Sequence, residues 1–208
     1  MNGAIYTPDP TEAEYFKFLT FTKEQFTVTW FYRAFAYSVD VPFDSKFFSQ
    51  RAIDVVDRFV SLWICFNSIL RTHYGEDKSD RDLLIACKKD AIWQTYFDTM
   101  KDHEFTTNFD YLKTLLPIKD MKSGKIVNMT KDDFSSLITV IYQIRNNLFH
   151  GRKSPNDTNT DDYYRIKASY FLLAPLVIEY ARETRLIATH VHQEFEIRSL
   201  EKGICFIG

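Results

Sequence analysis

A short segment around residue 145 combines side chains that could break a phosphodiester bond. The stretch IYQIRNNLFHG (141–151) ends an apolar run with Arg145, Asn146 and His150, and a glycine follows. An imidazole can accept the proton of a ribose 2′-hydroxyl or donate one to the leaving 5′-oxygen, and a guanidinium can stabilise the charge that develops on the phosphate. An asparagine beside them could orient the histidine or the phosphate. The three side chains are therefore candidate catalytic residues for metal-free RNA cleavage.

Further polar and basic residues flank this candidate site. Arg152 and Lys153 follow the glycine directly, so four potentially cationic side chains lie between residues 145 and 153. Such side chains form charge-assisted hydrogen bonds with phosphate oxygens. Asn147, Arg152 and Lys153 are therefore candidate substrate-binding residues.

The spacing within the segment indicates that one copy of the helix is not enough. Asn146 and His150 are four residues apart and share a helix face, whereas Arg145 lies about 140° away from the histidine around the axis. Two helices packed about a twofold axis could bring both motifs into one cleft. We therefore expect a homodimer formed through the helix that carries Arg145 and His150.

No metal-binding or cofactor-binding motif accompanies these residues. The sequence contains no GxGxxG, GxxxxGK[ST], GxSxG or HExxH pattern. His190 and His192 would share one face of a strand, but no nearby cysteine or carboxylate cluster completes a zinc site. We expect neither a metal ion nor a cofactor.

Helices are predicted to position the candidate site. Apolar residues recur at three- and four-residue steps, and capping or stop residues bound the segments. The predicted helices span about 48–74, 81–100 (which could break in its middle), 108–117, 131–150 and 161–187. Residues 119–129 are predicted to form a loop, and Pro175 should kink the last helix.

The two ends of the chain carry other patterns. The aromatic and β-branched residues of 26–39 favour a strand, whereas TEAEYFKFL (11–19) is typical of a helix start, so residues 1–47 are predicted to be an N-terminal extension of mixed structure. Residues 191–198 alternate as a strand does, and a turn and hairpin partner could follow. Residues 48–187 would then form one helical bundle, with 188–208 as a C-terminal strand segment packed on the same domain.

Composition agrees with a mainly helical globular protein. Hydrophobic residues make up 45% and aromatic residues 16% of the chain, while 6 Gly and 6 Pro are too few for a turn-dense β-protein. The longest uncharged apolar stretch, ASYFLLAPLVI (168–178), is shorter than the roughly 20 residues of a membrane span. The net charge of −2 produces no overall basic field. Cys65, Cys87 and Cys205 form no CxxC pair, which favours reduced thiols, and we expect a cytoplasmic protein with no membrane partner.

The segment YQIRNNLFHGRK (142–153) resembles the signature of the HEPN superfamily, an arginine followed by four to six residues and a histidine, with a polar residue after the arginine. RFVSLWICFNSIL (58–70) resembles the first long helix of its Apea-like, defence-associated branches. The resemblance covers about residues 48–187 and implies an up-and-down helical bundle that dimerises to bring both motifs together. Many members are metal-independent ribonucleases of toxin–antitoxin or antiviral systems, which implies RNA as substrate and an antitoxin or defence protein as partner.

Two other interpretations stay open. Some HEPN domains lack activity, so the chain could be a non-catalytic module that binds RNA, a nucleotide or a protein. Arg-x4-His also occurs by chance, and in an unrelated helical protein Arg145 would simply pair with an acid such as Asp132 or Asp133.

Overall fold

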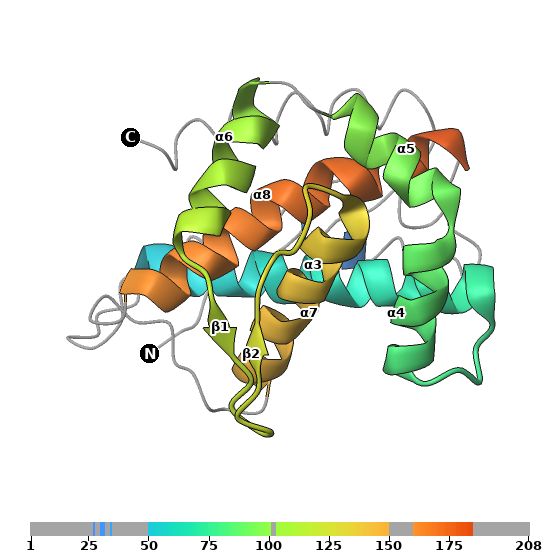
Figure 1. Cartoon of the computed structure of the whole chain (residues 1–208). Helices are drawn as coiled ribbons and strands as arrows, with labels where there is room; N and C mark the ends of the chain where they lie inside the picture. The colour runs from blue at the N-terminus through green and yellow to red at the C-terminus, as the bar shows by residue number, and fades with distance from the viewer. Residues whose placement is uncertain are drawn as a thin grey trace, which may run out of the picture.

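The computed structural model describes residues 27, 30, 31, 34, 50–100, 103–149 and 160–184. Most of the N-terminal extension, the C-terminal strand segment 188–208 and the candidate site residues His150, Arg152 and Lys153 lie outside the described residues. The described part is mainly helical, with one short antiparallel sheet (Figure 1). The predicted mainly helical fold class is therefore confirmed.

Six helices and two strands make up the described residues. The helices are α3 (Gln50–Tyr74), α4 (Asp80–Lys89), α5 (Ala91–Thr99), α6 (His103–Thr114), α7 (Phe134–Phe149) and α8 (Thr160–Glu183). The strands are β1 (Ile118–Lys119) and β2 (Ile126–Val127). None of these helices is both long enough and apolar enough to cross a membrane.

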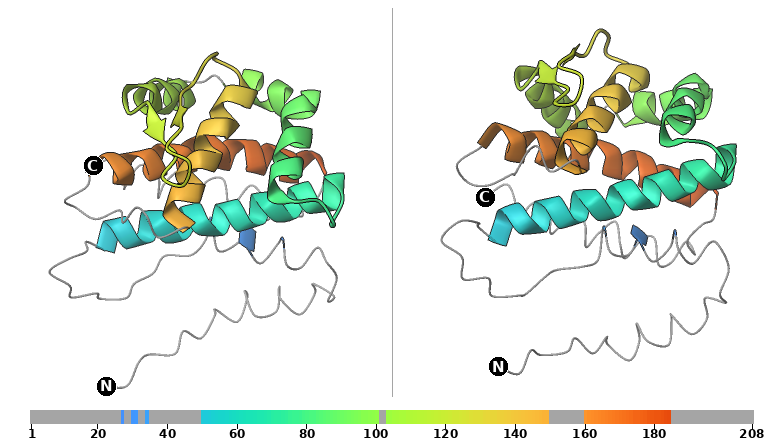
Figure 2. Two further views of the ribbon diagram at one scale, coloured as in Figure 1. Left: turned by 60° about the horizontal axis from the view of Figure 1, so that its bottom comes forward. Right: turned by 90° about the horizontal axis from the view of Figure 1, so that it is seen from below.

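The two longest helices, α3 and α8, lie side by side and run in the same direction (Figures 1 and 2). Near their ends, the Tyr180 hydroxyl of α8 lies 3.3 Å from Nδ1 of His73 on α3. α4 and the β1–β2 hairpin both pack against α7. The C-terminal half of α7, which carries the predicted site, is therefore held by elements that precede it in the chain.

The predicted helix over 81–100 is two helices because Asp90 interrupts it. Asp90 has extended backbone angles, φ −81° and ψ 120°, and its carboxylate accepts a hydrogen bond from the backbone N–H of Ile92. A carboxylate in this position satisfies one of the free N–H groups that begin a helix. Asp90 thus ends α4 and begins α5, which confirms the break that the sequence predicted.

The predicted loop over 119–129 is wrong in part, because it contains most of a small hairpin. Lys119 pairs with Ile126 and Ile118 with Val127. Asp120 organises the turn, since its carboxylate accepts hydrogen bonds from the Lys122 N–H and the Ser123 hydroxyl. Short strands joined by such a polar turn carry little hydrophobic alternation, so the pattern predicted only a loop.

Four described residues of the N-terminal extension are helical, although propensity favours a strand there. Thr27, Trp30, Phe31 and Ala34 are spaced as one face of a helix, and Phe31 and Ala34 are buried. The Tyr170 hydroxyl of α8 donates a hydrogen bond to the Ala34 carbonyl at 3.0 Å. Burial against the core outweighs the β-propensity of these residues.

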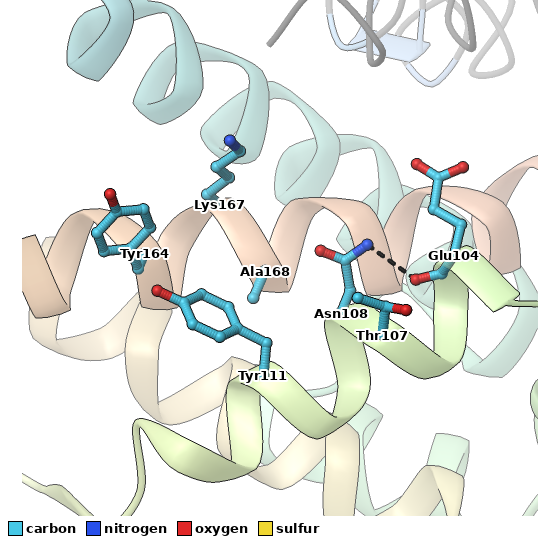
Figure 3. A pocket seen from close by; sticks show the side chains of 7 residues that line it. All are labelled: Glu104, Thr107, Asn108, Tyr111, Tyr164, Lys167 and Ala168. Carbon is cyan, nitrogen blue, oxygen red and sulfur yellow. Dashed lines mark hydrogen bonds between the residues drawn. The ribbon is translucent and has the colours of Figure 1, made fainter. Parts of the chain in front are cut away.

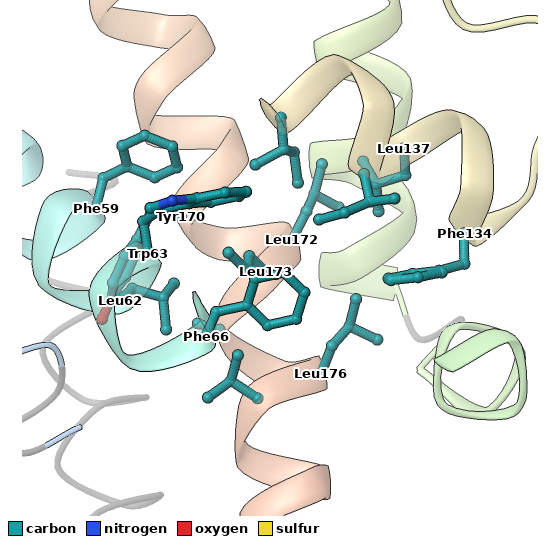
Figure 4. Close-up of a cluster of buried hydrophobic side chains, with 14 of the residues drawn as sticks. Phe59, Leu62, Trp63, Phe66, Phe134, Leu137, Tyr170, Leu172, Leu173 and Leu176 are labelled. Atoms are coloured by element: carbon teal, nitrogen blue, oxygen red, sulfur yellow. The ribbon is translucent and has the colours of Figure 1, made fainter. Parts of the chain in front are cut away.

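The core is built from aromatic and aliphatic side chains of α3, α7 and α8 (Figure 4). Trp93 of α5 joins it and is 1% exposed. Its ring stacks on Phe134 and Tyr180, with centroids 5.8 and 5.2 Å away. The indole N–H donates to the Tyr74 hydroxyl at 3.0 Å, so α5 is fastened to the end of α3.

Tyr74→Phe is expected to lower the free energy of unfolding by about 1–3 kcal/mol, because it leaves the buried indole N–H of Trp93 without its acceptor. It also removes the 2.7 Å hydrogen bond that the Tyr74 hydroxyl donates to Asp90. Urea unfolding checks the value. Tyr142→Phe is the matched control, because the Tyr142 hydroxyl has no hydrogen-bond partner among the described residues. Equal losses in both variants would contradict this assignment.

Candidate functional site

Arg145 lies in the last turns of α7 with its guanidinium held on several sides. Nη1 donates to Oδ1 of Asn146 at 3.0 Å, and Nη2 donates to Oδ2 of Asp80 at 3.1 Å. Its Cζ lies 4.4 Å from the ring centroid of Phe149 and 5.5 Å from that of Trp63. The side chain is 17% exposed, so the cation is fixed in place and only partly solvated. Such stacking and paired contacts are what a guanidinium favours over an ammonium group.

The carboxylate that pairs with Arg145 is shared with a second arginine. Oδ1 of Asp80 lies 2.8 Å from Nη2 of Arg71, which comes from the end of α3. Arg71 also donates to the backbone carbonyls of Glu76 and Lys78, so it is fixed by the α3–α4 turn. Two guanidinium groups therefore share one carboxylate, and this cluster carries one net positive charge.

Two buried donors beside this cluster have no hydrogen-bond partner among the described residues. They are Nε of Arg145 and the indole Nε1 of Trp63, whose side chains lie against each other. Trp63 is 3% exposed. Buried polar groups are nearly always paired, so unpaired ones require an explanation. The Arg71–Asp80–Arg145 cluster thus carries a surplus positive charge that is suited to an anionic group, whereas the two unpaired donors beside it are buried.

The acid that pairs with Arg145 is not one that the sequence suggested. Asp132 pairs with Lys113 at 2.9 Å, and the Asp133 carboxylate accepts a hydrogen bond from the Ser136 N–H at the start of α7. Asp80 instead lies 65 residues before Arg145 in the chain. The alternative in which Arg145 pairs with Asp132 or Asp133 is therefore wrong about the partner, although an ion pair exists.

Asn146 and Asn147 have different positions despite being neighbours. Asn146 is half-buried, and its side-chain oxygen accepts a hydrogen bond from Arg145. Asn147 is 5% exposed. Its Oδ1 accepts from Nε2 of Gln143 at 3.0 Å and from the Met121 N–H at 3.2 Å, and its Nδ2 donates to the Lys119 carbonyl at 2.9 Å. Asn147 therefore anchors the β1–β2 hairpin on α7, and this geometry does not support its predicted substrate contact.

Asn147→Ala is expected to lower the free energy of unfolding by about 1–3 kcal/mol, since it removes one hydrogen bond of the buried Gln143 amide and leaves the Lys119 carbonyl without its side-chain donor. Chemical denaturation checks this. Asn128→Ala removes the same side chain from an exposed position, where Oδ1 accepts a hydrogen bond from the neighbouring Met129 N–H and no other side-chain bond is formed with the described residues. A loss no larger than that of the Asn128 variant would show that the anchor contributes nothing.

The described residues offer neither a metal site nor a reactive cysteine. No group of three or more His, Cys, Asp or Glu residues among them could hold a metal ion. Cys65 and Cys87 are free and buried, as their apolar surroundings predicted. Burial raises the pKa of both thiols, which disfavours the thiolate that nucleophilic catalysis requires.

A separate hollow lies between α6 and α8. It has a volume of about 430 Å³, and Tyr111 and Tyr164 approach each other across it with ring centroids 5.7 Å apart (Figure 3). None of Arg145, Asn146 and Asn147, the described residues of the predicted site, lines this hollow. The Arg145 cluster and the hollow are therefore distinct features.

Sequence reasoning missed the residues that surround Arg145. Asp80 and Arg71 reach it only because α4 packs against α7 and follows α3 after a tight turn. The sequence pattern indicated Trp63 only as one member of an apolar helix face, and not as a contact of Arg145. Comparisons with models of known protein families, with curated proteins and with solved structures found no match to this chain.

Proposed function

We propose that this protein is a metal-independent endoribonuclease of the HEPN type. In this proposal Arg145, Asn146 and His150 cleave RNA at the interface of a homodimer formed through α7. The observation that carries the proposal is the guanidinium of Arg145, which is oriented by Asn146 and stacked on Phe149 and Trp63 at the helix end directly before His150. A pre-oriented cation is effective where charge develops on a phosphate, because it need not reorganise during the reaction.

The reaction follows from these side chains. His150 would take the proton of a ribose 2′-hydroxyl, whose oxygen forms a new bond to phosphorus while the bond from phosphorus to the 5′-oxygen breaks. The leaving 5′-oxygen takes up a proton, which a protonated His150 of the second copy would donate. Arg145 would stabilise the phosphate oxygens meanwhile. The products would be a 2′,3′-cyclic phosphate and a 5′-hydroxyl.

The resemblance to HEPN domains supports the biological part of the proposal. It points to a toxin–antitoxin or antiviral defence system in the cytoplasm, with an antitoxin or another defence protein as partner. The helical fold and the two helices that carry the resembling segments, α3 and α7, are compatible with this. Arg152 and Lys153 would bind substrate phosphates next to His150.

The test is cleavage of a mixed-sequence RNA in excess EDTA, with analysis of the product ends. We expect 2′,3′-cyclic phosphate and 5′-hydroxyl ends, and no cleavage of an otherwise identical strand that carries 2′-deoxyriboses throughout. The deoxy strand is the control because it lacks only the attacking oxygen. Products with 3′-hydroxyl ends, or cleavage that requires a divalent metal ion, would contradict the proposal.

One observation favours a second candidate, a non-catalytic HEPN module that binds RNA or a protein. The ion pair with Asp80 already neutralises part of the charge of Arg145, as a purely structural arginine would require. A folded dimer that binds RNA without cleaving it would identify this alternative.

A further inference from the structure

The β1–β2 hairpin carries three exposed lysines next to the candidate site. Lys119, Lys122 and Lys125 lie on it, and no carboxylate among the described residues pairs with them. Asp120 is the single acid between them, and its carboxylate is used inside the turn. Hydrogen bonds from the Ser123 hydroxyl and the Lys122 N–H lower the pKa of Asp120, so it stays ionised and organises the turn. The segment 119–125 therefore has three positive charges and one negative charge in a chain whose net charge is −2.

Several other cations of the described residues are held in ion pairs. Lys113 pairs with Asp110 and Asp132, and Arg165 pairs with Asp162 at 3.1 Å. Lys119, Lys122 and Lys125 are exposed, have no such ion pair among the described residues, and gather within the single short segment 119–125. An excess of unpaired positive charge on a short exposed element is the electrostatic pattern of a phosphate-binding surface.

The hairpin is rigidly attached to α7. Asn147 bonds to both the Lys119 carbonyl and the Met121 N–H, and Gln143 supports Asn147 from one turn earlier. Gln143 is 8% exposed, so this amide pair is buried. Figures 1 and 2 show the hairpin lying along α7 with its turn beside the C-terminal end of the helix. The position of the hairpin turn relative to Arg145 is therefore fixed.

The register of the hairpin separates its lysines into two groups. Lys119 pairs with Ile126, which is 64% exposed, so both lie on the outer face. The Asp120 N–H donates to the Lys125 carbonyl at 2.8 Å, so these two residues are opposite each other and lie on the other face. That face meets α7, because Ile118 on the same face is buried. Lys125 is therefore on the face that meets α7, and Lys122 lies in the turn, which is beside the C-terminal end of α7 (Figures 1 and 2).

We propose that the β1–β2 hairpin is a phosphate-binding arm, in which Lys122 and Lys125 hold the backbone of the RNA strand that enters the Arg145 site. The inference rests on the proposed function for the identity of the strand. It adds that the strand is positioned by sequence-independent phosphate contacts, since ammonium groups carry no base-specific pattern. Asn147 then acts in binding through the hairpin and not by touching RNA.

The experiment is the salt dependence of binding to a fluorescent 2′-O-methyl RNA, which cannot be cleaved. The double variant Lys122→Gln/Lys125→Gln is expected to bind about tenfold more weakly at moderate salt and to reduce the slope of log K against log [salt] by about 1.4, because two phosphate contacts are lost at roughly 0.7 each for a single strand. The matched control is Lys119→Gln/Lys131→Gln, which removes the same charge from the outer face and from the segment before α7.

The possible outcomes distinguish the phosphate-binding arm from the proposed endoribonuclease activity. An unchanged slope in the double variant, an equal loss in the control, or a wild-type protein that binds no RNA would each overturn the arm. Binding that depends on Lys122 and Lys125 in a protein that cleaves nothing would retain the arm and reject the endoribonuclease. Cleavage of RNA by a protein whose double variant shows an unchanged salt slope would retain the endoribonuclease and reject the arm.

Discussion

His150→Ala is expected to lower the rate of metal-free RNA cleavage by about 10²- to 10⁴-fold, the range over which a positioned general acid or base accelerates proton transfer. The imidazole is the one group of the proposed site that can accept and return a proton near neutral pH. Single-turnover rates in EDTA measure the effect, because they isolate the chemical step from product release.

The control for His150 is another histidine. His73 lies in the last turn of α3, 3.5 Å from Asp90, and takes no part in the proposed reaction. His73→Ala should keep the cleavage rate within about threefold of the wild type. Both variants should retain the dimer, as judged by light scattering. Full cleavage by a purified His150 variant would reject the histidine mechanism.

Arg145→Ala is expected to lower the same rate by about 10²- to 10³-fold, as does removal of one pre-oriented donor to a developing negative charge. Arg145→Lys should lie between the alanine variant and the wild type, since an ammonium group keeps the charge but loses the planar fork and the stacking on Phe149. Cleavage rates at saturating RNA measure both variants.

The structure supplies a matched control for Arg145. Arg71 binds the other oxygen of the same Asp80 carboxylate, and the two ion pairs have similar lengths of 2.8 and 3.1 Å. Arg71→Ala therefore removes an equivalent ion pair at a residue that takes no part in the proposed reaction, and at saturating RNA we expect cleavage within about threefold of the wild type. If both arginine variants lost activity equally, the effect would come from the packing of α4 and not from the reaction.

The elements that carry the site could be predicted because their patterns are local. The apolar face of α3, that of α7 and the break at Asp90 are each encoded by residues close together in the sequence. The helical conformation of Phe31 and Ala34 could not be predicted, since their propensity favours a strand and only burial against α8 reverses it. The hairpin was missed because each strand has two residues, too short for an alternating pattern.

The candidate site was predictable only along α7. Arg145 and Asn146 contact each other as neighbours on one helix, but Asp80 is 65 residues away and meets Arg145 through tertiary packing. The structural role of Asn147 could have been predicted from its spacing to Gln143. Gln143 and Asn147 are four residues apart among apolar residues, a spacing at which two amides share a helix face and can pair in a core.

The carboxylate shared by Arg71 and Arg145 has a consequence for how tightly any anion is held. Asp80 occupies one edge of the Arg145 guanidinium, so an incoming phosphate competes with an internal counter-ion that is always present at high local concentration. When a phosphate displaces Asp80 from Arg145, the ion pair between Arg71 and Asp80 remains, so the partly exposed carboxylate is not left without a counter-ion. In the proposed function Asp80 would thereby set a threshold: weak or isolated anions would fail to displace it, whereas a polyanion held at several points would succeed.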